Sequence, residues 1–274
     1  MVELRRTVRF SINPSGKTAP CTSSNGFGGI PSLQGLGRHY EIDVICRDNP
    51  NPATGYLIDI KRIDQAIRSS VVPVIEKACL EQPMTEPGEL LPTLLNHASV
   101  ALENALDFDG NLASICWRLG PYYCVQVQTQ NPKTVLLRQR FDLAAAHRLH
   151  VPKLSDDENR AVFGKCNNPN GHGHNYQIEP CIAIELTDQG KQVFTLADLE
   201  RLAQERLIEP FDHRHLNLDT AEFSDDGGVN PTVEHIAEVF YRILAEGLAS
   251  ATESARLVSM TVWETDRTSC TYPA

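Results

Sequence analysis

The sequence lacks an apolar run long enough to span a bilayer, and its first residues, MVELRRTVRF, lack the apolar stretch of a secretory signal. It also lacks an excess of positive charge, because 35 acidic residues outnumber 25 lysines and arginines and leave a formal net charge of -10. A nucleic-acid-binding protein usually carries a basic face, so this balance argues against that class. We therefore expect a cytoplasmic protein without membrane or nucleic-acid partners, in which local donors must hold any anionic substrate.

Disulfide-like cysteine spacing is missing as well, although the chain has eight cysteines. In a cytoplasmic protein such thiols are mostly reduced and buried, so a functional cysteine has to be identified by its neighbours. Histidine is scarce in the first half of the chain, since seven of the nine histidines follow residue 140. This distribution suggests that the two halves differ in their chemistry.

The C-terminal half carries the patterns of a small domain with strands and helices. Apolar residues alternate through Phe141, Leu143 and Ala145 as in a half-buried strand, and Thr195 precedes Asp198 by the spacing of a helix cap. The expected elements are strands at 141–147, 172–186 and 257–264, a possible strand near residue 272, a loop at 155–169, and helices that begin near 195 and 230.

The N-terminal half repeats this order about one half-chain earlier, which is the signal of an internal duplication. Val8, Phe10 and Ile12 alternate as in a strand. Further strands are expected at 37–46 and 123–129, and helices at 63–74 and 94–105. We expect a linker near Asn131-Pro132-Lys133 between two domains of the same fold.

Three histidines of the C-terminal half have the spacing of a metal site. His172 and His174 begin a predicted strand, where residues two apart point to the same face of the sheet. By itself such a pair is weak support, because exposed or core histidines outnumber ligands. His147, on the same face of the preceding strand, can supply a third ligand. Three imidazoles with an open fourth position describe a catalytic zinc site, not a closed structural one.

The residues around this pair resemble a known family. Residues 163–176, FGKCNNPNGHGHNY, are similar to the signature of the 6-pyruvoyl-tetrahydropterin synthase family, which includes the 6-carboxytetrahydropterin synthases. Further segments resemble that family in the same order: AAHRL at 145–149, DHRHLN at 212–217, NPT at 230–232 with Glu234, and Glu264-Thr265. The resemblance covers about residues 135–272.

The resemblance implies an α+β fold, the tunnelling fold, in which two helices cover one face of a small antiparallel sheet and copies join into barrels. Together with the duplication, it predicts two tandem tunnelling-fold domains, each with a four-stranded antiparallel sheet. Residues 1–132 would be a degenerate copy without the metal site, and residues 133–274 would be the catalytic domain.

The N-terminal copy departs from the family pattern at the positions that carry the chemistry. Leu36–Tyr40 stands where His172–Tyr176 stands, so both histidines of the pair are lost. Gln128-Thr129 replaces Glu264-Thr265, and the half has no counterpart of Asp212-His213. We therefore expect a copy that kept its fold and lost its activity.

By the same resemblance, zinc (Zn2+) would be held by His147, His172 and His174. Cys166 would be the general base, since its polar neighbours argue against a buried, inert thiol. Asp212 would orient His213 in an acid-base relay, with His215 as a competing imidazole.

The resemblance assigns substrate binding to residues near the C-terminus. Glu264 would accept hydrogen bonds from the amino group and ring N–H of a pterin. Thr232 and Thr265 would contribute to the same pocket, although the hydroxyl of Thr232 would also suit a helix cap without any ligand.

The function implied by the resemblance is that of a zinc-dependent lyase of tetrahydrobiopterin biosynthesis. It would convert 7,8-dihydroneopterin triphosphate to 6-pyruvoyl-tetrahydropterin with loss of triphosphate. Two alternatives stay open: a 6-carboxy-tetrahydropterin synthase of the queuosine pathway acting on the same substrate, and a non-catalytic pterin- or purine-binding protein. The first two differ in pocket geometry that the sequence does not specify.

The resemblance also bears on assembly, because in this family the Asp-His pair of one subunit completes the site of another. The N-terminal half has no such pair to donate, so C-terminal domains must neighbour one another. We therefore expect a homotrimer whose six domains mimic a hexamer of single-domain relatives, or a larger homo-oligomer.

Overall fold

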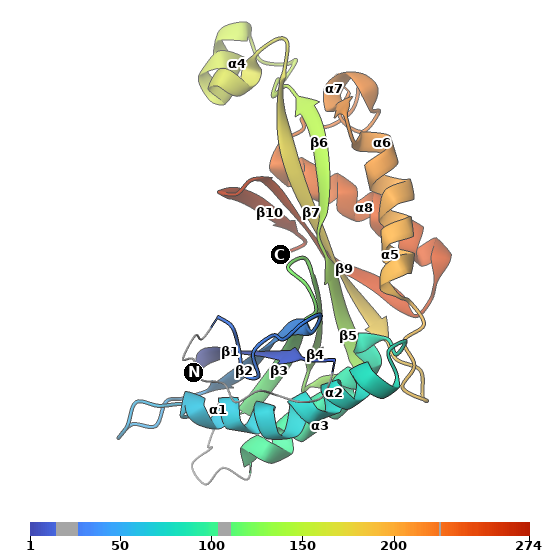
Figure 1. The fold of residues 1–274 in the computed structure, drawn as a ribbon. Coiled ribbons are helices and arrows are strands. Elements are labelled where there is room, and N and C mark those ends of the chain that lie inside the picture. The colour runs from blue at the N-terminus through green and yellow to red at the C-terminus, as the bar shows by residue number, and fades with distance from the viewer. Residues whose placement is uncertain (15–26, 104–110, 225) are drawn as a thin grey trace. The chain divides into compact units, whose positions relative to one another are not determined.

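The computed structural model describes residues 1–14, 27–103, 111–224 and 226–274, and it shows a mixed α+β protein (Figure 1). The chain divides into two compact units. The first unit is Met1–Leu137 with Ile184–Val193, and the second is Arg138–Ala183 with Phe194–Ala274. No helix in the described part of the chain has the length and apolar character needed to cross a membrane.

An antiparallel sheet forms the centre of the first unit. Its strands, in sheet order, are β1 (Val2–Ile12), β2 (Arg38–Asp48), β3 (Asn111–Arg118) and β4 (Tyr123–Gln128). The register pairs Val8 with Ile42, and Ile42 with Trp117, so that their buried side chains share one face of the sheet. Because residues two apart in a strand point to the same side, this alternation builds a core on that face.

Helices cover this face of the first unit (Figure 1). They are α1 (Ile60–Ala66), the π-helical turn η1 (Ile67–Val71), α2 (Val72–Glu81) and α3 (Pro87–Glu103). The expected strands and helices are confirmed in type, while the predicted helix end at Ala105 falls outside the described residues. Strand β3 was not expected, because the side chains from Ile115 to Trp117 are buried without the alternation that marks a half-buried strand.

The predicted linker at Asn131-Pro132-Lys133 is wrong, because these residues begin strand β5 (Asn131–Gln139) after a two-residue turn. Proline is tolerated near the beginning of a strand, where its missing N–H disturbs few ladder hydrogen bonds. Strand β5 therefore carries the chain from the first unit into the second. The domain boundary that we placed at residue 132 stays a prediction.

The second unit also has a sheet, and it positions the candidate site. β6 (Phe141–His147) pairs antiparallel with β7 (His172–Glu185) and parallel with β8 (Arg214–His215). β7 also pairs with β9 (Ala255–Thr265), which pairs with β10 (Thr268–Tyr272). The strands expected near residues 141, 172, 257 and 272 are therefore confirmed.

The helices of the second unit begin where local capping signals lie. They are α5 (Leu196–Ala203), the π-helical turn η3 (Gln204–Ile208), α6 (Glu209–Phe211), α7 (Leu216–Asp219) and α8 (Val233–Ala251). Thr195 caps α5 in a capping box with Asp198, as the spacing predicted. The second helix begins two residues after Pro231, because Thr232 is its cap. Buried Phe211, Phe223 and Phe240 contact one another beneath these helices.

The segment expected as a loop at 155–169 contains a helix that the sequence analysis missed. Ser155 and Glu158 form a capping box that begins α4 (Asp156–Phe163), and the 3-10 helix η2 (Gly164–Asn167) follows. The sequence of α4, DDENRAVF, has no continuous apolar stripe, so its periodicity gave no helix signal.

The two units share their order of elements: two strands, a helix interrupted by a π-helical turn, a second helix and two strands. This common order supports an internal duplication, which stays a prediction.

Candidate metal centre and active site

The pairing of β6 with β7 brings three histidines together at one end of the sheet. His147 lies opposite His172, and Ala145 lies opposite His174, so that the three imidazoles project from one face. The Nε2 atoms of His147 and His172 are 3.1 Å apart, and one ligand nitrogen from each histidine lies within 4.8 Å of the others. The structure therefore places the three predicted metal ligands side by side.

His147 is held in one tautomer. Its side chain is fully buried, and its Nδ1–H donates to the carbonyl oxygen of Pro231 at 2.7 Å. Nε2 is then left with a lone pair that faces the other two histidines. Burial lowers the pKa of His147 to about 4 against the opposing effect of the Pro231 hydrogen bond, and burial together with His174 lowers the pKa of His172. Neutral imidazole is the form that binds metals.

The donor set fits a zinc ion. Nδ1 of His172 and Nε2 of His174 are buried and have no hydrogen-bond partner in the described part of the chain. Two nitrogens that each lie about 2.0–2.1 Å from one tetrahedral ion would be separated by about 3.3 Å, close to the observed spacing of His147 and His172. Glu264 adds a carboxylate whose Oε1 is 3.5 Å from Nε2 of His147 and of His174. A cation here would meet neutral nitrogen ligands and one negative charge.

Cys166 lies on η2, close to this cluster. Its thiol is half-buried, and its carbonyl oxygen accepts a hydrogen bond from the N–H of Leu149 at 2.9 Å. Burial raises the pKa of the Tyr176 hydroxyl, and the nearby Glu264 and Cys166 raise it further. That hydroxyl is also 3.3 Å from Nδ1 of His147. Cys166 is therefore within electrostatic reach of the residues around the histidine cluster and is accessible enough to exchange a proton.

Asp212 and His213 form the expected pair. Asp212 Oδ2 lies 2.7 Å from His213 Nδ1, and its Oδ1 accepts from the N–H of Ala144 at 2.8 Å. Although burial pushes the pKa of Asp212 upward, the hydrogen bonds from Ala144 and His213 outweigh it and leave that pKa below its usual value. His213 has φ 57°, a left-handed conformation unusual for a residue with a side chain.

The imidazole of His213 is 82% exposed, and within the described residues no contact joins it to the histidine cluster. The predicted relay is thus assembled as a pair, but not against the metal ligands of its own chain.

The other predicted substrate residues have clear structural contacts. The hydroxyl of Thr232 accepts from the N–H of His235 at 3.4 Å and caps α8, and the hydroxyl of Thr265 accepts from the N–H of Arg267 at 3.2 Å. Glu264 ends strand β9 beside the histidines. Contact of these three residues with a pterin stays a prediction.

Two features that hold the site were missed by the sequence analysis. Asn217, which is buried, accepts from the N–H of Arg148 at 2.8 Å and donates to the carbonyl oxygen of Arg148 at 3.1 Å. Gly171 has φ 70°, and a Cβ there would lie 2.5 Å from Nε2 of His215 and 3.0 Å from the carbonyl oxygen of His147. Both features fix the backbone next to the metal ligands. Asn217 lies in the segment DHRHLN, but its partner is 69 residues away and invisible to a local pattern.

Replacing Asn217 by alanine is expected to lower the free energy of unfolding by about 1–3 kcal/mol, because a buried backbone N–H and C=O lose their partners. Zinc affinity should fall as well, because Arg148 directly follows His147. Urea unfolding and a competitive zinc titration measure the two effects. Asn175→Ala, an exposed asparagine on β7, is the control and should change neither. Wild-type values for Asn217→Ala in both measurements would show that the clamp is unimportant.

Comparison with known proteins identifies relatives of the second half of the chain. The family described as 6-pyruvoyl tetrahydropterin synthase matches residues 136–274. The 6-pyruvoyl tetrahydrobiopterin synthase of Homo sapiens is 37% identical over 134 residues, which are 49% of this chain and 88% of that protein. A putative 6-pyruvoyl tetrahydrobiopterin synthase of Caenorhabditis elegans is 34% identical over 139 residues, which are 50% of this chain and 94% of that protein.

Among solved structures, that of Caenorhabditis elegans 6-pyruvoyl tetrahydropterin synthase is 34% identical in sequence and superposes with a TM-score of 0.46. The matched region is 51% of this chain and 94% of that one.

Proposed function

The chain belongs to the 6-pyruvoyl tetrahydropterin synthase family, and we propose that it is a zinc-dependent lyase that converts 7,8-dihydroneopterin triphosphate to 6-pyruvoyl-tetrahydropterin with loss of triphosphate. The observation that carries this proposal is the convergence of His147, His172 and His174, with Cys166 close by, within the half that the family matches. The named relatives are synthases of the same kind.

The three histidines would hold zinc through their neutral nitrogens. Zinc, when bound, acts as a Lewis acid that makes a C–H bond next to a bound oxygen easier to ionise. The carbonyl oxygen of Pro231 keeps the lone pair of His147 pointed at the ion, since a ligating histidine is oriented by the partner of its other nitrogen.

Proton transfer would rest on Cys166 and the Asp212-His213 pair. Cys166 would take a proton from the side chain of the substrate as a thiolate and return it at a neighbouring carbon. Asp212 would hold His213 in the tautomer with a proton on Nδ1, which leaves Nε2 as the exchanging atom.

Recognition of the pterin would rest on Glu264. A carboxylate can accept two parallel hydrogen bonds from the amino group and ring N–H of a pterin. Glu264 is about one-fifth exposed and therefore open to a ligand at the edge of the histidine cluster. Thr232 and Thr265 would border the same space.

Incubation of the zinc-loaded protein with 7,8-dihydroneopterin triphosphate, followed by mass spectrometry of the products, tests the proposal. Release of triphosphate with formation of 6-pyruvoyl-tetrahydropterin is the expected result. Formation of 6-carboxy-tetrahydropterin would instead support the alternative product, and binding without turnover would support a non-catalytic pterin-binding protein. Either result would refute the proposed reaction.

We also expect the protein to be a homotrimer of about 91 kDa, three times the 30.4 kDa chain, or a multiple of that assembly. The exposed imidazole of His213 supports this assembly, because it is free to enter the site of a neighbouring chain. Light scattering coupled to gel filtration measures the mass.

Complementation tests the sharing of sites between chains. Cys166→Ala and His213→Ala subunits, each inactive alone, should recover about a quarter of wild-type activity when unfolded together and refolded as mixed assemblies. An active monomer, or mixed assemblies without activity, would contradict a shared site.

A further inference from the structure

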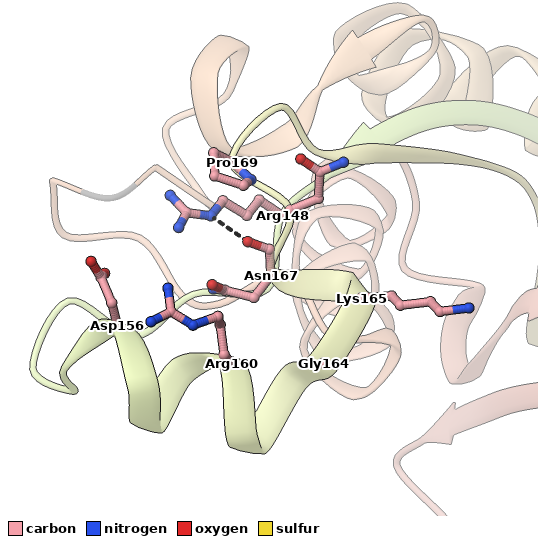
Figure 2. Close-up of a pocket in the computed structure, with 8 residues that line it drawn as sticks. Arg148, Asp156, Arg160, Gly164, Lys165, Asn167 and Pro169 are labelled. Atoms are coloured by element: carbon pink, nitrogen blue, oxygen red, sulfur yellow. Dashed lines mark hydrogen bonds between the residues drawn. The ribbon is translucent and has the colours of Figure 1, made fainter.

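A second cavity of the C-terminal unit, of about 560 Å³, lies beside η2 (Figure 2). We call it the basic pocket. It is lined by Arg148, Asp156, Arg160, Gly164, Lys165, Asn167, Asn168 and Pro169. Three of these residues are cations and one is an anion, in a chain whose net charge is -10. A local excess of positive charge in an acidic protein is a feature that burial and folding do not require.

Two guanidinium groups face the same space. Figure 2 shows Arg148 and Arg160 turned toward it, with Asp156 beside Arg160 and the side chain of Lys165 directed away. Nε of Arg148 donates to the carbonyl oxygen of Asn167 at 3.3 Å, and within the described residues its terminal nitrogens have no partner. Arg160 forms an ion pair with Asp157, whose side chain is 91% exposed. Such a pair is weak in water and can exchange for a stronger anion.

This arrangement suits phosphate groups. A guanidinium presents a planar fork of N–H donors that matches two phosphate oxygens, and it keeps its charge at every physiological pH. The volume exceeds that needed for one phosphate, and two arginines from different segments can contact successive groups of a chain. An isolated carboxylate ligand would leave part of these donors unused.

The basic pocket is also adjacent in sequence to the candidate active site on both of its walls. Arg148 directly follows His147, and Lys165 and Asn167 flank Cys166. A ligand that begins at the histidine cluster and passes Cys166 can therefore reach the pocket with its far end.

We propose that the basic pocket binds the triphosphate chain of the substrate through Arg148 and Arg160. The inference rests on the proposed function and adds the residues that recognise the leaving group. Asp156 opposes binding by its charge, so the proposal also predicts the sign of its removal.

Calorimetric titration of the purified full-length protein with inorganic tripolyphosphate tests the site directly. Arg148→Gln and Arg160→Gln should each weaken binding about tenfold or more, because charged hydrogen bonds to phosphate are lost. Arg201→Gln is the matched control, since Arg201 is an exposed helical arginine paired with Asp198 as Arg160 is with Asp157. It should stay within about twofold of wild type, whereas Asp156→Asn should bind more tightly.

Steady-state kinetics identify the source of the phosphates. Tripolyphosphate should compete with 7,8-dihydroneopterin triphosphate, and Arg160→Gln should raise KM for this substrate more than it lowers kcat. Non-competitive inhibition would assign the pocket to a separate polyphosphate and overturn the proposal. Equal binding by Arg160→Gln and Arg201→Gln would overturn it as well.

The zinc content of each variant, measured before and after titration, shows whether a variant or the probe has disturbed the metal site instead. The calorimetry does not depend on turnover. Failure of the proposed reaction is therefore distinguishable from failure of the pocket.

Discussion

Replacing Cys166 by alanine is expected to lower the turnover of 7,8-dihydroneopterin triphosphate by about 10²–10⁴-fold, the usual effect of removing a general base. Zinc content should stay at the wild-type level, because Cys166 is not among the three clustered ligands. Pterin binding should also persist, since Glu264 lies on a different strand. Single-turnover kinetics at saturating substrate measure the chemical step, and metal analysis measures the zinc.

Cys79→Ala provides a control for this experiment. Cys79 is also half-buried, but it lies on α2 in the unit without the histidine cluster. Its removal should leave turnover unchanged. If Cys166→Ala turned over at the wild-type rate, its thiol would have only a packing role on η2, and another group would have to remove the proton.

Replacing His172 and His174 together by alanine is expected to abolish zinc binding and reduce activity to background. Two of the three ligands are lost, and His147 alone offers one nitrogen, whereas catalytic zinc sites use three protein ligands. Metal analysis after dialysis against a weak chelator should give one zinc per wild-type chain and none in the variant. The expected ratio follows from the one group of this kind found among the residues that the structure describes.

His39→Ala with His97→Ala is the matched control, because it removes two histidines from the N-terminal half. The side chain of His39 lies 3.3 Å from the hydroxyl of Ser11 and belongs to the segment that replaces the histidine pair. This control should keep its zinc. Two zinc ions in the wild-type chain, or zinc retained by the His172→Ala, His174→Ala variant, would contradict a single site at the cluster.

Features specified by neighbouring residues were predictable from the sequence. Alternation at Phe141–His147 identified a strand, and Thr195 with Asp198 identified a helix start, because both signals repeat within a few residues. The proximity of His147 to the pair at His172 and His174 also followed, since adjacent strands of an antiparallel pair share a face. The segment FGKCNNPNGHGHNY was contiguous, so it indicated the family directly.

Features that depend on residues far apart in the chain were decided by the tertiary structure alone. Asn217 clamps the backbone of Arg148 from 69 residues away, and no local pattern marks that pairing. The amphipathic signal also failed at α4, whose polar sequence forms a helix because of a capping box. His213 belonged to a motif, yet only the fold showed that its imidazole faces outward.

The basic pocket belongs to the same group, because Arg148 and Arg160 are brought to one space by the path of the chain through α4 and η2. The sequence by itself therefore determined the family, the strands and the chemistry of the residues, which local spacing encodes. The tertiary structure decided which groups face one another, because hydrogen bonds and charges act across space without regard to separation along the chain.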